Sequence, residues 1–287
     1  MQEIWTIQKV LNWSQDYFHK HQVPDPRLSA ELLLAGVLNL QRLELYLQFE
    51  RILTADELAQ YRSYVQRRVK FEPVQYILGQ QDFMGLTFSV TPAVLIPRPE
   101  TELLVEAVLA EITQRNNPSL TIIDIGTGSG AIAISLAHLL PQARMIALDN
   151  SEAALKVAQH NAQRLEVANI SFLLLDFFTD SLSKLGKSDI IVSNPPYVSQ
   201  EQFENLHPQV KNFEPSQALL AGSDGLDFVR KLIQRAPEIL IDGGLIFFEI
   251  GFDQRNQIEN LLLSHQFKNI SFIKDLQNIY RIVKAQL

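Results

Sequence analysis

Cysteine is absent from the 287-residue sequence, which excludes a disulfide framework, a zinc site built on thiolates and a cysteine nucleophile. The lack of cysteine also favours a cytoplasmic location. None of the six histidines stands at metal-ligand spacing from another histidine or from a carboxylate, so we expect no metal site.

An excess of positive charge is missing as well. The sequence has 25 lysines and arginines against 32 aspartates and glutamates, which gives a formal net charge of −7. Proteins that bind long nucleic acids through the phosphates usually have a basic surface. The acidic balance therefore argues against direct DNA binding.

Long hydrophobic runs are also lacking. Charged residues interrupt the first 20 positions, so we expect no signal peptide. The longest stretch without a formal charge, residues 125–143, contains three glycines and a proline, whereas a membrane-spanning helix would be more uniformly apolar. We therefore expect no membrane segment and interpret this stretch as a glycine loop followed by a buried helix.

Apolar residues are nevertheless abundant enough to build a core, since 46% of the residues are hydrophobic and 20% are charged. A chain of this length fits two domains. In residues 1–75 the apolar positions recur at intervals of three and four, which predicts an all-helical domain. Asp25-Pro26 predicts an N-cap followed by proline at the first helical position. Thr54 and Glu57 have capping-box spacing, so a helix should begin there.

A different pattern follows the helical region. Residues 76–98 look extended and predict a hairpin linker. From Pro99 onward, helical patterns alternate with short apolar segments that predict strands at residues 121–124, 145–149, 171–175, 190–193 and 245–250. This alternation predicts a Rossmann-like α/β domain with a mostly parallel sheet over residues 99–287. Residues 271–273 and 279–283 predict a closing hairpin that brings the sheet to seven strands and adds an antiparallel one.

A glycine-rich loop follows the first predicted strand. It runs Gly126-Thr-Gly128-Ser-Gly130, and glycines at such a turn let the backbone approach a ligand closely. Asp149 ends the next strand, where a carboxylate can accept hydrogen bonds from both ribose hydroxyls of a nucleoside. The spacing formally allows a nicotinamide dinucleotide. However, Asp124 would repel a pyrophosphate and attract a cationic group, so the loop favours S-adenosylmethionine over NAD.

A second motif, Asn194-Pro195-Pro196-Tyr197, ends the fourth predicted strand. Ligands of doubly wound sheets bind beyond the carboxyl ends of the strands, so we expect Asn194 beside the reactive end of the cofactor. The Asn194 side-chain oxygen and the Pro195 carbonyl can accept both protons of a planar NH2 group, which orients its lone pair and stabilises positive charge on nitrogen. Tyr197 offers a flat face for stacking. The motif predicts methyl transfer to an amide or aromatic amine.

Together these motifs resemble those of class I methyltransferases that act on planar amino groups. Over most of its length the sequence is similar to the protein-(glutamine-N5) methyltransferases, which modify the Gly-Gly-Gln glutamine of bacterial peptide chain release factors. The further matching segments are residues 73–79, 83–86, 95–102, 124–133, 213–215, 225–227 and 249–251. The resemblance implies a class I methyltransferase fold, S-adenosylmethionine as cofactor and a release factor as protein substrate. We expect the enzyme to be a monomer.

The resemblance also implies roles for single residues. The methionine part of the cofactor would be wrapped by Gly126, Thr127, Gly128, Ser129 and Gly130. Its ribose would be held by Asp149, and its adenine would be contacted by Asp176 and Phe177. The target glutamine amide would be held by the catalytic pair Asn194 and Pro195, with Asn194 also touching the cofactor, and by Pro196 and Tyr197. The substrate entrance would be lined by Phe83 and Arg98, for which a core aromatic and a solvated arginine are equally good interpretations.

Three segments outside the motifs have expected roles at the protein substrate. Residues 199–217 are long for a plain loop, so we expect a lid. Residues 1–75 are expected to dock on the release factor, because one glutamine must be chosen from many. A basic cluster near residue 70 could contact an acidic partner, although a solvated helix end is the more common reason for such a cluster. Its members are Arg62, Arg67, Arg68 and Lys70.

Two other functions stay open on the residues alone. An adenine-N6 DNA methyltransferase uses the same planar-amine chemistry, but it would need a basic target-recognition domain and a means to flip the base. The acidic sequence shows no such region. A non-enzymatic nucleotide-binding module would instead keep its cellular role after Asn194 is changed.

Overall fold

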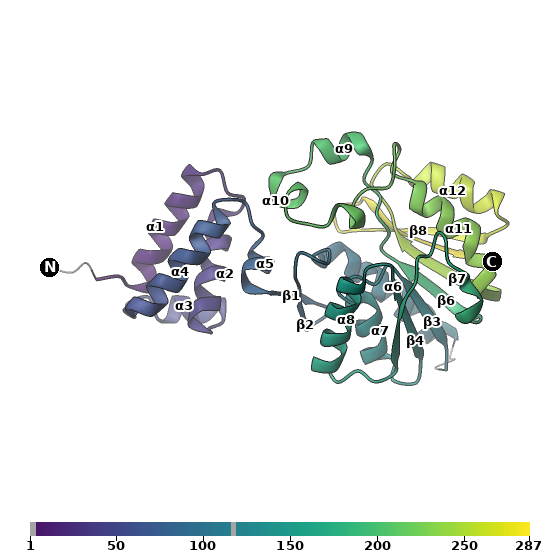
Figure 1. Cartoon of the computed structure of the whole chain (residues 1–287), viewed down its shortest axis with the longest axis horizontal. Helices are drawn as coiled ribbons and strands as arrows, with labels where there is room; N and C mark the ends of the chain where they lie inside the picture. The colour runs from purple at the N-terminus through teal and green to yellow at the C-terminus, as the bar shows by residue number, and fades with distance from the viewer. Residues whose placement is uncertain (1–3, 116–118) are drawn as a thin grey trace. The chain divides into compact units, whose positions relative to one another are not determined.

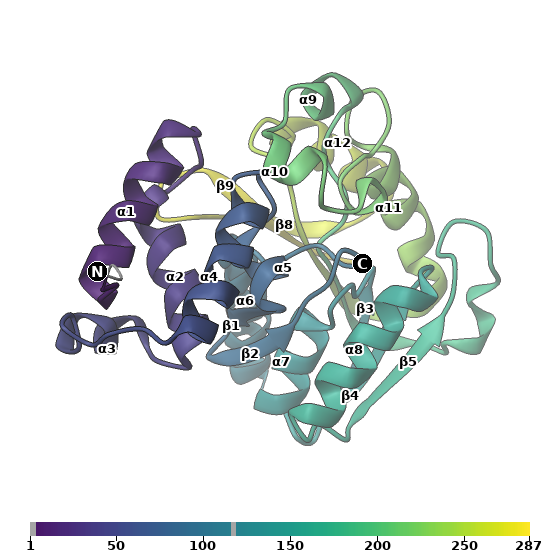
Figure 2. The same cartoon turned by 60° about the vertical axis from the view of Figure 1, so that its left-hand side comes forward.

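The computed structural model describes residues 4–115 and 119–287. The chain divides into two compact units, whose elements are labelled in Figures 1 and 2. The first unit comprises Met1–Gln80 and His207–Phe213, and the second comprises Gln81–Leu206 and Glu214–Leu287. The domain roles predicted for residues 1–75, 76–98 and 99–287 stay predictions.

The first unit is helical, as the sequence predicts. Its helices are α1 (Ile7–Lys20), α2 (Pro26–Leu38), α3 (Arg42–Leu47), α4 (Ala55–Arg68), α5 (Val74–Leu78) and α10 (Pro208–Lys211). Their core includes the fully buried side chains of Ile7, Phe18, Leu33, Leu34 and Leu45. Burial of this apolar surface, worth about 25 cal/mol per Å², is the main force that holds the helices together.

Both helix starts predicted in this unit are present. Thr54 Oγ1 accepts a hydrogen bond from the Glu57 N–H at 3.2 Å, and Glu57 Oε2 accepts one from the Thr54 N–H at 2.8 Å, so the capping box is confirmed. Pro26 is the first residue of α2, as predicted. Asp25 is the N-cap, also as predicted, but its backbone is left-handed (φ 46°) and its side chain makes no capping hydrogen bond.

The basic cluster at the end of α4 includes two structural arginines. Arg67 donates to both carboxylate oxygens of Glu72, at 2.8 and 2.5 Å. Arg68 is only 3% exposed, and it donates to Ser29 Oγ at 3.1 Å and to the Glu72 carbonyl at 3.0 Å. These guanidinium groups therefore stabilise the unit from within, which explains their position better than contact with an acidic partner does.

In the described part of the second unit, a seven-stranded sheet forms the centre, as predicted. Its strands are β3 (Thr121–Ile125), β4 (Arg144–Asp149), β5 (Ile170–Leu174), β6 (Ser188–Ser193), β7 (Leu240–Glu249), β8 (Lys268–Lys274) and β9 (Tyr280–Gln286). Their spatial order is β5-β4-β3-β6-β7-β9-β8; the first five are parallel, and β9 runs antiparallel to both of its neighbours. A separate two-stranded sheet of β1 (Gln80–Phe83) and β2 (Leu86–Ser89) lies in the segment predicted to be extended.

Helices cover both faces of the large sheet, as Figure 1 shows. One face packs against α6 (Pro99–Arg115), α7 (Ala131–Leu139) and α8 (Glu152–Arg164), and the other against α11 (Asp227–Ile239) and α12 (Arg255–Ser264). Because side chains alternate along a strand, Ile122 joins the first core and Ile123 the second. The remaining short elements are α9 (Gln200–Glu204) and the 3-10 turns η1 (Leu182–Lys184) and η2 (Ser216–Ala218). Among the residues that the structure describes, no helix combines the length and the apolar character that crossing a membrane requires.

The strand order brings the two sequence motifs together. Strand β3 lies between β4 and β6, so the winding of the sheet changes direction at this point. The carboxyl ends of β3 and β6 are adjacent, and Ser193 Oγ donates to the Ile125 carbonyl at 2.7 Å. Ligands of open α/β sheets bind at such a switch. The glycine loop after β3 and the motif of residues 194–197 after β6 therefore flank one site.

Candidate active site

A cavity of about 640 Å³ opens at the carboxyl ends of the parallel strands. This volume lies within the range of small-molecule sites. The predicted site residues that line it are Gly126, Thr127, Gly128, Ser129, Asp149, Asp176, Phe177, Asn194, Pro195 and Pro196. The fold thus gathers most of the predicted cofactor and substrate residues around one cavity, although they come from four different connections.

The glycine loop is held in a tight turn by the neighbouring strand. The N–H groups of Gly126 and Thr127 both donate to the Leu148 carbonyl, at 2.9 and 2.8 Å. Gly128 has a φ of 56°, which a residue with a side chain rarely adopts. Gly130 is not among the cavity-lining residues; it is the N-cap of α7 and has a φ of 83°, a backbone conformation that favours glycine.

Asp149 has its carboxylate oriented by two backbone groups. Its oxygens accept hydrogen bonds from the N–H groups of Gly128 and Ser151, each at 2.9 Å. Burial raises the pKa of Asp149, and these hydrogen bonds oppose that increase. The side chain therefore connects the glycine loop to the start of α8 while it also lines the cavity.

Asp124 is completely buried at the end of β3. Its Oδ2 accepts a hydrogen bond from Thr127 Oγ1 at 2.7 Å, whereas its Oδ1 has no partner in the described structure. Burial raises the pKa of Asp124 to about 7, and the negative charge of Asp149 adds to the increase. Asp124 does not itself line the cavity, but its neighbour Ile125 and its partner Thr127 do. Once ionised, the buried carboxylate would favour a cationic ligand in that cavity.

The adenine side predicted for the cavity is formed by the segment after β5. Phe177 is 4% exposed and lines the cavity, and the Arg235 guanidinium lies 5.6 Å from its ring centroid. Arg235 also donates to the Phe177 carbonyl at 2.6 Å, so it holds the segment as well as the ring. Phe178 and Phe228 line the same cavity, with ring centroids 5.1 Å apart, and neither had been singled out from the sequence.

Asn194 is fixed by a chain of hydrogen bonds that the sequence analysis missed. Its Nδ2 donates to Thr101 Oγ1 at 2.9 Å, and Thr101 Oγ1 donates to Glu249 Oε2 at 2.6 Å. Tyr197 donates its hydroxyl to the other oxygen of Glu249 at 3.2 Å. Glu249 is completely buried, which raises its pKa, and both hydroxyl bonds oppose the increase.

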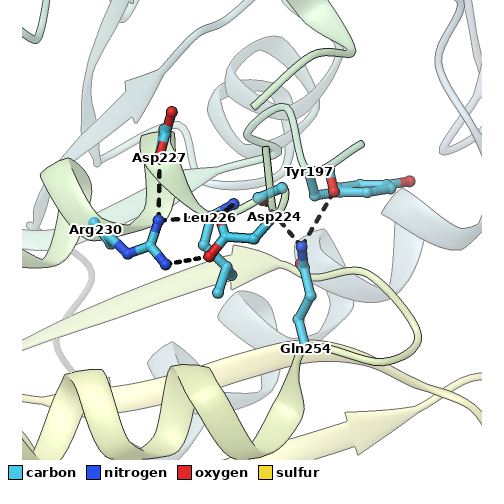
Figure 3. A network of polar contacts seen from close by, with 7 residues as sticks. Tyr197, Asp224, Leu226, Asp227, Arg230 and Gln254 are labelled. Carbon is cyan, nitrogen blue, oxygen red and sulfur yellow. Dashed lines mark hydrogen bonds and ion pairs between the residues drawn. The ribbon is translucent and has the colours of Figure 1, made fainter. Parts of the chain in front are cut away.

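Tyr197 is therefore anchored at two points, and it is not among the residues that line the cavity. Its carbonyl accepts from Gln254 Nε2 at 3.1 Å, and the same amide donates to the Gly225 carbonyl at 3.0 Å. Figure 3 shows Gln254 reaching from below to Tyr197 and the 224–226 turn, which Arg230 braces through Asp224 and Asp227. A Cβ at Gly225 would lie 2.4 Å from the Tyr197 carbonyl, so only glycine fits beside the motif.

The two residues predicted to line the substrate entrance do not line the cavity. Phe83 is 1% exposed and packs edge-on against Phe88, so the core-aromatic interpretation is correct for it. Arg98 does not line the cavity either; it donates to the buried carboxylate of Glu214 at 2.5 Å. Glu214 also accepts from the Ile96 N–H at 3.2 Å, so this pair ties two segments next to the cavity together.

The segment predicted as a lid contains short helical turns rather than a plain loop. It includes α9, α10 and η2, and its residues Pro215 and Gln217 line the cavity. Its role as a lid stays a prediction.

Two family models match separate parts of the chain. The family model described as PrmC N-terminal domain matches residues 9–79, and a methyltransferase domain model matches residues 116–221. The 16S rRNA N2 G1207 methyltransferase of T. thermophilus, solved with AdoMet and guanosine, superposes with a TM-score of 0.52 at 21% identity, over 72% of this chain and 49% of that chain. The fold and the site define a class I methyltransferase.

Relatives identified by sequence show which family of methyltransferases the chain resembles. The release factor glutamine methyltransferase of Geobacter sulfurreducens is 42% identical over 99% of this chain and 98% of its own length. That of Koribacter versatilis is 41% identical over 97% of each chain. The chain belongs to the release factor glutamine methyltransferase family, which confirms the resemblance drawn from the motifs.

Proposed function

We propose that the protein transfers a methyl group from S-adenosylmethionine to the side-chain amide nitrogen (N5) of the glutamine in the Gly-Gly-Gln motif of bacterial peptide chain release factors. Membership of the family supports the reaction and the class of substrate. The observation that carries the proposal for the site is the orientation of Asn194. Its Nδ2 is bonded to Thr101, which leaves its Oδ1 as an acceptor for the cavity that Asn194 lines.

The cavity residues fit S-adenosylmethionine, whose sulfonium would supply an electrophilic methyl group. Backbone groups of the loop from Gly126 to Ser129 would hold its methionine part, next to the unpartnered oxygen and negative charge of Asp124. Asp149 would accept the ribose hydroxyls, as an acidic residue at the end of the second strand does in nucleoside-binding folds. Phe177 would pack on the adenine, with Asp176 toward the amino group.

The chain's own groups would then activate a nitrogen that is a poor nucleophile. Asn194 Oδ1 and the Pro195 carbonyl would accept the two protons of the glutamine amide, which turns the nitrogen lone pair toward the cofactor side of the cavity. The same two acceptors would stabilise the positive charge that grows on nitrogen during the reaction. As the nitrogen–methyl bond forms, the bond from sulfur to the methyl carbon breaks and S-adenosylhomocysteine is left. Because the N–H proton becomes acidic only at that stage, no strong general base is needed beforehand, and the proton leaves to water.

The reaction is tested by co-expressing the protein with a release factor and analysing the factor by mass spectrometry. We expect one added methyl group on the glutamine of Gly-Gly-Gln, and a much smaller methylated fraction when Asn194 is replaced by alanine. Transfer of tritium from labelled cofactor to DNA instead of to the factor would favour the adenine-N6 alternative. Cofactor binding without any methylation would favour the non-enzymatic module.

Recognition of the folded substrate can be tested with the same assay. If residues 1–75 dock on the release factor, the intact factor should be methylated much faster than a short Gly-Gly-Gln peptide at equal concentration. Equal turnover of the two would remove the docking role. We expect the enzyme to act as a monomer in the cytoplasm, where release factors work.

Cofactor binding should strengthen as the pH rises, because burial raises the pKa of Asp124 to about 7. Below that pH the free protein holds a proton on Asp124, and a cationic cofactor binds best once the proton has left. If the bound cation lowers this pKa well below 6, linkage predicts a roughly tenfold lower Kd at pH 8 than at pH 6. Calorimetric titration with S-adenosylmethionine measures the change.

Asp124→Asn is the matched control for this titration. It should bind the cofactor more weakly at pH 8, since the charge is gone, and its Kd should vary little with pH. A variant that keeps the full pH dependence would contradict the role of Asp124.

A further inference from the structure

We propose that Thr101 and Glu249 are positioning residues that hold the Asn194 amide with its oxygen, rather than its NH2 group, facing the substrate amide. The proposal rests on the function proposed above for Asn194. It concerns two residues outside the 194–197 motif, contributed by the start of α6 and the end of β7.

The donors and acceptors of Glu249, Thr101 and Asn194 determine which end of the Asn194 amide faces Thr101. Each oxygen of Glu249 has a hydroxyl donor, and these two bonds stabilise the ionised form against the effect of burial. The proposal takes Glu249 as ionised, and an ionised carboxylate can only accept. Thr101 has a single hydroxyl proton, and its Oγ1 lies 2.6 Å from Glu249 Oε2. With that proton donated to Glu249, Oγ1 can only accept from Asn194, whose nearest atom is Nδ2 at 2.9 Å. The NH2 end of Asn194 is thereby fixed toward Thr101.

Tyr197 completes the arrangement from the other side of the carboxylate. Its hydroxyl donates to Glu249 Oε1 at 3.2 Å, so both oxygens of the buried group have partners. The phenol thus supports the carboxylate that orients Thr101, and this contact explains why the last residue of the motif is a tyrosine although its side chain does not line the cavity. Figure 3 shows its backbone end, where Gln254 holds the carbonyl.

The orientation matters because asparagine has two ends of opposite polarity. With Oδ1 toward the substrate, Asn194 accepts an N–H and stabilises positive charge on the glutamine nitrogen. If the amide turned over, its NH2 group would meet the substrate NH2 group, donor against donor. Both ends have nearly the same size, so packing alone does not select between them, whereas the Thr101–Glu249 pair does.

The test uses the full-length enzyme and an intact release factor. Thr101→Val keeps the shape of the side chain but removes the hydroxyl. We expect kcat to fall about 30-fold, less than for loss of a preorganised group itself, because Asn194 is still present. Thr101→Ser retains the hydroxyl and should stay within about threefold of the wild type. Glu249→Gln brings in an amide NH2 that can donate to Thr101, and it should lower kcat by at least about fivefold.

Binding measurements separate positioning from general damage to the fold. The Kd for S-adenosylhomocysteine and the KM for the release factor should change by less than about threefold in Thr101→Val, because its cavity and surface are intact. Equal losses in Thr101→Val and Thr101→Ser, or a kcat of Thr101→Val within twofold of the wild type, would overturn the proposal. A wild-type kcat in Glu249→Gln would show that Glu249 is not needed to position Asn194.

Asn194→Ala distinguishes failure of this inference from failure of the proposed site. If Asn194→Ala is inactive while Thr101→Val is fully active, Asn194 holds the substrate without needing the pair. If Asn194→Ala keeps wild-type kcat, the function proposed for Asn194 is itself wrong, and the inference fails with it.

Discussion

Replacing Asn194 with alanine should lower kcat for methylation of the release factor by about 100- to 1,000-fold. The side-chain oxygen is one of only two acceptors proposed for the glutamine NH2 group, and such preorganised groups contribute roughly 3–4 kcal/mol to transition-state stabilisation. The loss should fall on kcat, because the positive charge on nitrogen grows only as the reaction proceeds. Single-turnover methylation of an intact release factor measures it.

The variant should still fold and bind its cofactor. The change removes one polar contact, to Thr101, from a half-buried side chain, so the Kd for S-adenosylmethionine should stay within about fivefold of the wild-type value. Asn256→Ala, at an exposed position on α12, is a matched control and should methylate at the wild-type rate. A loss of less than tenfold in Asn194→Ala would count against its catalytic role.

Local patterns explain why much of the fold could be predicted. The strands are short, apolar and separated by helical periodicity, and the winding rules of α/β sheets then place the ends of β3 and β6 side by side. Glycines at positions of positive φ mark the turn after β3, whatever the rest of the chain does. The cavity and the two motifs that flank it follow from these short-range features.

Side-chain contacts between segments far apart in the sequence could not be predicted from local patterns. Thr101 and Glu249 are 148 residues apart, and Arg98 and Glu214 are 116 apart, so no local spacing indicates either contact. All four lie in segments that resemble the family, but a resemblance does not say which atoms meet. For Phe83 the sequence left two interpretations open, and its 1% exposure favours the core one.

The backbone conformation of Asp25 could not be predicted, for a local reason. Residue types favoured at N-caps also tolerate the left-handed region, so the sequence Asp-Pro is compatible with two backbone conformations. The structure has the left-handed one at φ 46°, and the Asp25 carbonyl accepts from the Ser29 N–H at 2.8 Å. The sequence therefore predicts where α2 begins but not whether the Asp25 side chain caps it.

Replacing Asp149 with alanine should weaken binding of S-adenosylmethionine by at least about 100-fold. Two hydrogen bonds from ribose hydroxyls to a carboxylate would be lost, and bonds to charged groups contribute about 1.5–3 kcal/mol each. The variant also loses the bond that holds the Gly128 N–H at 2.9 Å, so the glycine loop itself becomes less ordered. Calorimetric titration with the cofactor measures the Kd.

Comparing cofactor affinity and kcat across variants shows whether Asp149 acts by binding the nucleoside. Asp149→Asn can accept only one of the two backbone N–H bonds through its single side-chain oxygen, so it should bind with an affinity between those of alanine and the wild type. Asp253→Ala removes an exposed carboxylate outside the cavity lining and should bind normally. At saturating cofactor, Asp149→Ala should recover most of the wild-type kcat, because Asp149 binds the nucleoside and leaves the amide to Asn194. A kcat that stays low at saturation would mean that the glycine loop, once released by Asp149, no longer presents the methyl donor to the 194–197 motif.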